Sequence, residues 1–303
     1  MPNLLRESEP TQGQAQAGAP LTIALAGNPN SGKTTIFNTL TGGRQHVGNY
    51  PGVTVEKKHG TCRRGNTRLR VVDLPGTYSL TAYSSEELIA RDFLIAERPN
   101  AVIDILDAGN LERNLYLAVQ IMELGVPLVL ALNMSDVARQ RGLQFDLTLL
   151  SELLGVPIVA TVGHRGLGKD ELLDAAVELA SRPQRPTPRR IDYGPEVEAE
   201  IDTLKRLIDQ AGVALAGVPA RWLAVKLLEG DTQVREQLGG NGLIDAADKA
   251  AQRLESLRGD SPEALIADRR YGFIAGACQE AGRSTVESRR SMSDRIDTVV
   301  KRW

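Results

Sequence analysis

The chain has 303 residues, of which 42% are hydrophobic and 24% charged, a composition typical of a globular chain with one large or two smaller domains. Its formal net charge of −2 gives no electrostatic argument for a nucleic-acid partner, which would require a surplus of basic residues. No run of about 18 apolar residues is present, so we expect no membrane-spanning helix in these residues.

Cysteine and histidine usage argues against a disulfide framework or a zinc site. Cys62 and Cys278 lie far apart and belong to no paired motif. The three histidines, His46, His59 and His164, lack the spacing of metal ligands.

The first half of the chain alternates short apolar runs with amphipathic stretches. Residues 1–20 are rich in Gln, Gly, Ala and Pro, lack the features of a signal peptide, and are expected to be a disordered tail. Strands are expected at 21–27, 69–76, 101–108, 127–136 and 157–163, with a further strand pairing with 69–76 across a turn at Gly65-Asn66. Helices are expected at 33–42, 84–99, 111–125, 145–155 and 169–181. This order predicts an α/β fold with a mostly parallel six-stranded sheet and helices on both faces.

The second half of the chain has a different character. Residues 183–194 form a proline-rich stretch that is expected to link a domain at 21–182 to a second one at 195–285. Four amphipathic segments after the linker, without a convincing strand, predict a small all-α helical domain. The last residues, SMSDRIDTVVKRW at 291–303, are polar and are expected to be frayed.

A glycine-rich stretch, GNPNSGKT at 27–34, matches the phosphate-binding pattern G-x-x-x-x-G-K-[ST] between a predicted strand and a predicted helix. Its backbone N–H groups and the helix N-terminus suit the phosphates of a nucleotide. Lys33 is expected to bridge the β- and γ-phosphates, and the Thr34 hydroxyl to bind Mg²⁺. The nucleotide-binding residues expected in this loop are Gly27, Asn28, Pro29, Asn30, Ser31, Gly32, Lys33, Thr34 and Thr35.

The tetrapeptide DLPG at 73–76 ends a predicted strand about 40 residues further on. Asp73 is expected to hold Mg²⁺ through water, and the Gly76 N–H to contact the γ-phosphate and so respond to its hydrolysis. Ras-type GTPases have a glutamine after this glycine that orients the attacking water, whereas this chain has Thr77 followed by Tyr78.

Two further loops are expected to bind the base. NMSD at 133–136 fits the N-x-x-D pattern, in which the Asp136 carboxylate accepts two hydrogen bonds that guanine can donate and adenine cannot. Asn133 is expected to brace this loop, with Met134 beside it. The loop after the last strand is expected to complete the pocket with Val162, Gly163 and His164, although it departs from the usual Ser-Ala-Lys-like pattern.

Residues 44–58 connect the phosphate loop to the DLPG strand and are expected to form a mobile first switch segment. Thr54 is the candidate for a further Mg²⁺ ligand, because it precedes an expected strand. Gly52 and Val53, next to it, are expected to contact the nucleotide. A plain surface connection is the alternative interpretation of this segment.

Together these residues resemble the cytosolic G domain of the FeoB family of ferrous-iron transporters. The matching stretches are GNPNSGKTTIFNTLTG, VGNYPGVTVEKK, DLPGTYSL, DAGNLERNLYLAVQIMELG and LNMSD, which cover residues 22 to 136 densely. Residues 190 to 285 resemble the family's appended helical domain in position and character. VGNYPGVTVE and DAGNLERNLYL are specific to the family, whereas the other motifs are shared with many GTPases.

The resemblance implies a regulatory GTPase fragment followed by a membrane permease in the full-length protein, on the cytoplasmic face of a bacterial inner membrane. Residues 286–303 as a whole are expected to be the approach to this membrane domain, which lies outside this chain. It implies that the helical domain stabilises the GDP-bound state and relays switch movement toward the membrane. Fe²⁺ would pass through the part beyond this chain, so no iron ligand is assigned. Small cytosolic accessory proteins and a homo-oligomer are further expected partners, and nucleic acid is not.

Three sources could replace the missing glutamine: an arginine from a partner, an arginine of this chain such as Arg44, or a monovalent cation. Resemblance to FeoB favours K⁺ held by Asn30 and backbone carbonyls of residues 48–52. Glu86 or Glu87 could assist the water from further away, or could simply be acids at a helix N-terminus. The predicted catalytic residues are therefore Asn30, Lys33, Gly52, Thr54 and Gly76, with Mg²⁺ and K⁺ as cofactors.

The function predicted from the sequence is Mg²⁺-dependent GTP hydrolysis, stimulated by K⁺, in a ferrous-iron transporter. Two alternatives remain at this point: a free-standing GTPase associated with RNA or the ribosome, and a nucleotide-sensing module with negligible turnover.

Overall fold

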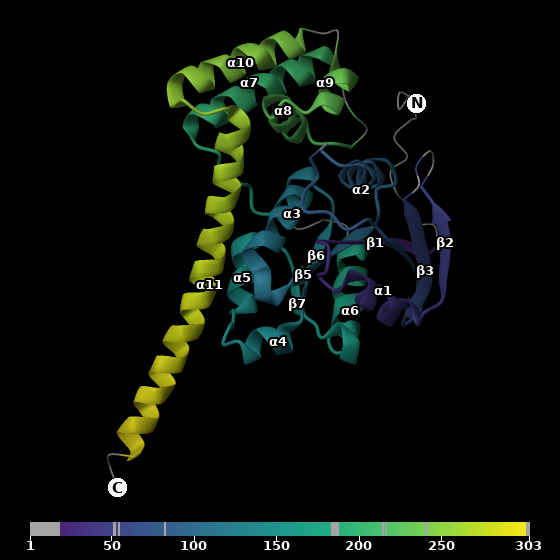
Figure 1. The fold of residues 1–303 in the computed structure, drawn as a ribbon, viewed down its shortest axis with the longest axis vertical. Helices are drawn as coiled ribbons and strands as arrows, with labels where there is room; N and C mark the ends of the chain where they lie inside the picture. The colour runs from purple at the N-terminus through teal and green to yellow at the C-terminus, as the bar shows by residue number, and fades with distance from the viewer. Residues whose placement is uncertain are drawn as a thin grey trace.

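The computed structural model describes residues 19–50, 53, 55–81, 83–182, 188–213, 215, 217–239 and 242–300. Its first half is an α/β domain built on a mixed seven-stranded sheet in the order β2-β3-β4-β1-β5-β6-β7 (Figure 1). The strands are β1 (Leu21–Gly27), β2 (Gln45–Asn49), β3 (Glu56–Arg64), β4 (Thr67–Asp73), β5 (Ala101–Asp107), β6 (Leu128–Asn133) and β7 (Ile158–Ala160). Strands β4, β1, β5, β6 and β7 run parallel, and β3 is antiparallel to both of its neighbours.

The α/β fold class is confirmed, but the predicted number of six strands is wrong. The additional strand is β2, which occupies part of the segment that we expected to be a mobile loop. All five β2 residues are exposed, so the strand has no alternation of buried and exposed positions that its sequence could reveal. It pairs only with β3 and forms one edge of the sheet.

Helices cover both faces of the sheet. One face packs against α1 (Lys33–Thr41) and α6 (Lys169–Ser181), through a core that includes Phe37 and Leu172. The other face packs against α2 (Ser85–Ala96) and α3 (Leu111–Leu124). The shorter elements of this domain are η1 (Ala108–Asn110), α4 (Ser135–Gln140), α5 (Leu147–Leu154) and η2 (Gly163–Arg165).

Local sequence signals explain where these helices begin and end. Ser84 caps α2 in a capping box, in which its side chain accepts from the Glu87 N–H and the Glu87 carboxylate accepts from the Ser84 N–H. Helices α1, α3 and α5 each end at a glycine in the left-handed conformation, namely Gly42, Gly125 and Gly155.

The second half of the chain is helical. It contains α7 (Pro195–Ala211), α8 (Ala220–Leu228), α9 (Thr232–Leu238), α10 (Leu243–Arg258) and α11 (Pro262–Val300). We expected four helical segments, and the seven-residue α9 was missed because it is too short to show a clear period. The expectation of a frayed end is also wrong, because α11 continues to Val300. Residues 183–187 of the predicted linker and most of the predicted tail lie outside the described residues.

The helical part packs against the α2 and α3 side of the α/β domain, and α11 passes along α3 and α5 (Figure 1). Buried residues of both parts, among them Leu115, Tyr193 and Trp222, belong to one continuous hydrophobic core. In the part of the chain that the structure describes, none of the helices combines the length and the apolar character that crossing a bilayer requires.

Candidate nucleotide-binding site

The phosphate loop lies between the carboxyl end of β1 and the start of α1. Its turn is tight: the Ser31 N–H donates to the Asn28 carbonyl at 3.1 Å, and Gly32 has φ = 88°. A Cβ at Gly32 would lie 2.2 Å from the Asn133 amide nitrogen, so only glycine fits there. No side chain caps the N-terminus of α1, which leaves its first N–H groups available to an anion.

Several side chains of this loop have polar atoms without partners. Both polar atoms of the Asn28 side chain and the Ser31 hydroxyl are buried and have no hydrogen-bond partner among the described residues. Pro29 and Asn30 are exposed at the tip of the loop. Asn30 adopts φ = 67°, a left-handed conformation that is uncommon outside glycine and is tolerated best by Asn and Asp.

Lys33 and Asp73 meet at the entrance to the loop. The Lys33 ammonium lies 2.5 Å from the Asp73 carboxylate, and the two side chains are only 12% and 9% exposed. Thr34 and Thr35 are exposed in the first turn of α1. A carboxylate and a threonine hydroxyl are the hard oxygen donors that Mg²⁺ prefers, so Asp73 and Thr34 fit this ion chemically.

The DLPG tetrapeptide packs directly against the phosphate loop. A Cβ at Gly76 would lie 3.4 Å from the backbone nitrogen of Pro29, and the Thr77 N–H donates to the Gly27 carbonyl at 3.3 Å. Gly76 is therefore beside the loop that is expected to hold the phosphates.

The first switch segment reaches the site through Tyr50. The Tyr50 side chain is buried, and its hydroxyl donates to the Asp73 carbonyl at 3.4 Å. Burial and the nearby Asp73 carboxylate raise the pKa of Tyr50, which keeps the phenol protonated. Val53 is 38% exposed. The predicted residues Gly52 and Thr54 lie outside the described residues. Arg44 is exposed before β2.

Asn133 connects the predicted base-binding loops to the phosphate loop. Its amide group donates to the Ser31 carbonyl at 2.9 Å and accepts from the Gly163 N–H at 3.0 Å. The side chain is buried, so both hydrogen bonds are shielded from water. One residue thus holds the carboxyl ends of β1, β6 and β7 in fixed relation.

Asp136 lies at the start of α4, one residue after Ser135, whose hydroxyl donates to the Thr161 carbonyl at 2.8 Å. The Asp136 Oδ1 atom is buried and has no partner among the described residues. Met134, just before this turn, adopts φ = 56°. A buried carboxylate oxygen without a donor is costly, and a guanine base would supply the donors that it lacks.

The loop after β7 closes this side of the site. The Val162 N–H donates to the Leu167 carbonyl at 3.1 Å, and the Val162 side chain is buried. Gly163 packs close to Ile36 of α1, where a Cβ would lie 2.9 Å from the Ile36 Cδ1 atom. His164 is exposed in η2.

The contacts of Glu87 lie at the N-terminus of α2. It completes the α2 capping box and accepts a hydrogen bond from the Ser79 hydroxyl at 2.6 Å. Glu86 is exposed in the first turn of the same helix. Both positions match the interpretation of acids at a helix N-terminus.

Two residues that the sequence analysis did not select also contact the segment after Gly76. Gln120 of α3 accepts a hydrogen bond from the Leu80 N–H at 2.5 Å. The guanidinium of Arg113 lies 4.5 Å from the centre of the Tyr78 ring. A signal was present in the sequence, because Gln120 lies among the apolar residues of α3, where Asn114 is the other buried polar side chain.

Both halves of the chain are similar in sequence to known proteins. The family model of ferrous iron transport protein B matches residues 21–176, and that of the FeoB cytosolic helical domain matches residues 193–282. The Fe(2+) transport protein A/Fe(2+) transporter FeoB fusion protein of Porphyromonas gingivalis is 44% identical over 292 residues, covering 93% of this chain and 34% of that protein. The Fe(2+) transporter FeoB of Escherichia coli K12 is 38% identical over 290 residues, covering 92% of this chain and 36% of that protein. This chain therefore spans about a third of the length of the curated relatives that it matches.

Solved structures of FeoB cytosolic domains share the fold. A mutant NFeoB of S. thermophilus bound to mGDP superposes with a TM-score of 0.80 at 37% identity, covering 87% of this chain and all of that one. The cytosolic domain of the T. maritima FeoB iron transporter in a GDP form gives a TM-score of 0.76 at 34% identity, covering 87% of this chain and 98% of that one.

Proposed function

Because the chain belongs to the FeoB family of ferrous iron transport proteins, we propose that it binds GTP and hydrolyses it to GDP and phosphate as the regulatory part of a ferrous iron transporter. The observation that carries this proposal is the pair of hydrogen bonds by which the Asn133 amide donates to the Ser31 carbonyl and accepts from the Gly163 N–H, since it joins the phosphate loop to the base-binding loops. The GDP-bound structures of relatives support the same ligand class.

Guanine selection is assigned to Asp136. Its buried Oδ1 atom and the second carboxylate oxygen accept from the guanine N1 and N2 hydrogens, and adenine offers no such pair of donors. Val162, Gly163 and His164 border the base on the side of β7, and Met134 lies beside it.

Lys33, Thr34 and Asp73 hold the phosphates and the Mg²⁺ ion, with Thr54 as the predicted ligand from the first switch segment. Mg²⁺ supplies charge neutralisation at the β- and γ-phosphates when it is bound. Lys33 pairs with Asp73 in the structure, and with nucleotide bound its ammonium would be the partner of the phosphates and the Asp73 carboxylate a partner of Mg²⁺. The Gly76 N–H donates to the γ-phosphate.

Asn30 would hold K⁺, which when bound would supply the positive charge that Ras-type enzymes receive from an arginine finger. The left-handed backbone of Asn30 presents a neutral amide oxygen at the exposed tip of the loop, a suitable donor for a weakly hydrated cation. Backbone carbonyls of residues 48–52 are the predicted further ligands, of which 51 and 52 lie outside the described residues. Gly52 and Thr54 position the attacking water in place of a glutamine.

The rate of GTP hydrolysis is expected to rise several-fold when K⁺ replaces Na⁺ at constant ionic strength, since K⁺ neutralises charge that develops between the phosphates. Asn30→Ala is expected to abolish this increase while leaving the rate in Na⁺ nearly unchanged. Phosphate release by the wild-type chain and the variant, measured in both salts with Mg²⁺ present, checks the prediction. Equal rates in K⁺ and Na⁺ for the wild-type chain would remove K⁺ from the proposal.

The remaining partners follow from the family. We propose that the permease part of the full-length protein lies beyond this chain and that the chain works at the cytoplasmic face of the membrane. Accessory proteins and self-association stay predictions. A free-standing RNA-associated GTPase is set aside, because both halves of the chain match FeoB models.

A further inference from the structure

The stretch DAGNLERNLYL at 107–117 supplies none of the residues assigned above to the nucleotide or its metal ions, although Arg113 contacts the segment after Gly76. Most of it forms the first turns of α3. Along α3, the polar or aromatic residues Arg113, Tyr116, Gln120 and Glu123 are spaced by three, four and three positions. This spacing places all four on one stripe of the helix.

Two members of the stripe hold the segment that follows Gly76. The Arg113 guanidinium stacks on the ring of Tyr78 at 4.5 Å, and Gln120 accepts the hydrogen bond from the Leu80 N–H. Gln120 and Leu80 are each only 1% exposed, so water cannot replace this bond. Tyr78 and Leu80, two positions apart after Gly76, are thus held by two α3 residues that lie two helical turns apart. We call these two contacts the α3 grip.

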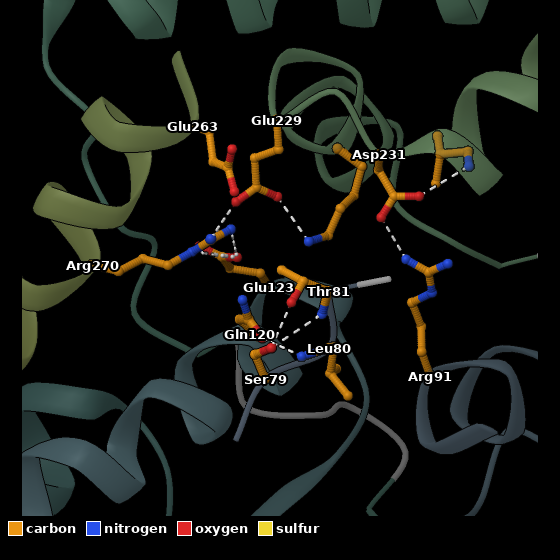
Figure 2. Close-up of polar contacts among 12 residues, drawn as sticks. Ser79, Leu80, Thr81, Arg91, Gln120, Glu123, Glu229, Asp231, Glu263 and Arg270 are labelled. Atoms are coloured by element: carbon orange, nitrogen blue, oxygen red, sulfur yellow. Dashed lines mark hydrogen bonds and ion pairs between the residues drawn. The ribbon is translucent and has the colours of Figure 1, made fainter. Parts of the chain in front are cut away.

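The other two members of the stripe contact the helical part of the chain. Tyr116 stacks on Tyr271 of α11 with ring centres 4.7 Å apart. Glu123 accepts from the Arg270 guanidinium at 2.8 Å and from the Tyr193 hydroxyl. Figure 2 shows Gln120 close to Leu80 and Glu123 close to Arg270.

The grip on Leu80 limits where Gly76 can lie. Only Thr77, Tyr78 and Ser79 separate the two residues, and Ser79 is itself bonded to Glu87 of α2. An extended chain rises about 3.3 Å per residue, so Gly76 lies within about 13 Å of a fixed Leu80. Without the contacts to α3, Gly76 would be held near the phosphate loop by its packing on Pro29 and by the 3.3 Å hydrogen bond from the Thr77 N–H to the Gly27 carbonyl, so we expect its position to be less well fixed.

We propose that Gln120 and Arg113 are positioning residues for GTP hydrolysis, which hold Leu80 and Tyr78 on α3 so that the Gly76 N–H stays aligned with the γ-phosphate. In Ras-type GTPases a glutamine after this glycine orders the reaction centre. In this chain, fixation of the backbone after Gly76 by α3 supplies part of that order. The expected effect on turnover rests on the proposed GTPase function. The contacts of Gln120 with Leu80 and of Arg113 with Tyr78 belong to the fold and do not depend on that function.

Gln120→Met keeps the size of the side chain and removes the acceptor, so the buried Leu80 N–H loses its partner. It is expected to lower kcat for GTP about tenfold, with the Kd for GDP changed less than twofold. It is also expected to accelerate hydrogen exchange of the Leu80 amide in the GDP complex by at least about tenfold, as measured by NMR on the full chain. Gln120→Glu retains an acceptor oxygen and is expected to restore slow exchange and most of kcat.

Arg113→Gln removes the stacking cation from an exposed site and is expected to lower kcat about two- to fivefold without affecting folding. Glu112→Gln is the matched control, because Glu112 is the neighbouring exposed residue. Its charge acts on α11, where burial of the thiol and then the Glu112 carboxylate raise the pKa of Cys278 to about 12. The control is expected to leave kcat and Leu80 exchange unchanged.

Unchanged kcat and unchanged Leu80 exchange in Gln120→Met and Arg113→Gln would overturn the inference. A fall in nucleotide affinity that parallels kcat in both variants would also overturn it, since this indicates general damage to the site. If the wild-type chain does not hydrolyse GTP, the proposed function fails, whereas Leu80 exchange in the GDP complex still decides whether the grip exists.

Discussion

Asp136→Asn is expected to weaken GTP binding about a hundred- to ten-thousand-fold. In the proposed complex the carboxylate would accept two hydrogen bonds from guanine, and a hydrogen bond to a charged group is worth about 1.5–3 kcal/mol. An asparagine amide offers one acceptor and one donor, so it repels one of the two guanine hydrogens. Xanthine carries a carbonyl in place of the guanine amino group, and xanthosine triphosphate should therefore bind the variant better than it binds the wild-type chain.

Equilibrium titration of both triphosphates against both proteins checks this prediction. Asp202→Asn, at an exposed position of α7, makes the same chemical change outside the α/β domain and is expected to leave both affinities unchanged. A variant of Asp136 that keeps the wild-type preference for GTP would remove this residue from the base pocket.

Arg270→Met is expected to lower the free energy of unfolding by about 3–5 kcal/mol. Arg270 is fully buried on α11, where it pairs with Glu123 of the α/β domain and Glu229 of the helical part (Figure 2). Burial alone would lower the pKa of Arg270, but these two carboxylates raise it, so the group stays charged. Its removal leaves Glu229 with Lys226 alone and leaves the mostly buried Glu123 carboxylate with the Tyr193 hydroxyl but without the Arg270 cation.

The comparison is Arg253→Met, which makes the same substitution in an ion pair with Glu200 whose arginine side chain is 52% exposed. The expected loss there is about 0.2–1 kcal/mol, because solvent screens exposed pairs. Urea unfolding of the wild-type chain and the two variants, followed by circular dichroism, measures both effects. Equal losses for the buried and the exposed pair would contradict the assignment of Arg270 as a central link between the two parts.

The order of strands and helices in the α/β domain could be predicted because its signals are local. Capping residues such as Ser84 and terminal glycines such as Gly125 set the helix ends, and continuous apolar runs mark the buried parallel strands. Strand β2 carries no such signal, since QHVGN is exposed along its whole length and is stabilised only by pairing with β3.

The site loops could be placed from motif spacing, because parallel strands bring their carboxyl ends to one edge of the sheet. The bonds that hold these loops together could not, since Asn133 reaches Ser31 across 102 positions of sequence. Asp104 illustrates the same limit. It lies in an apolar strand, burial raises its pKa to about 8, and the sequence alone does not indicate that this carboxyl is protonated at neutral pH.

The ion pairs between the α/β domain and the helical part could not be predicted from the hydrophobic periodicity of the sequence. Arg91, Arg270 and Glu123 occupy amphipathic helices, where charged residues ordinarily mark the solvent face. In the structure Arg91 is 1% exposed and bonds to Asp231, and Arg270 bonds to Glu123 across 147 positions. Only the packing of α11 and α9 against α3 and α2 makes these pairs internal.

A single-turnover assay tests the central claim most directly. The wild-type chain, in excess over radiolabelled GTP or ATP, is followed for phosphate release in Mg²⁺ and K⁺. The account predicts that GTP is converted to GDP and phosphate, that ATP is not cleaved, and that chelation of Mg²⁺ stops the reaction. GTP that binds but is never cleaved would identify a nucleotide-sensing module, and would contradict the assignment of this chain as a GTPase.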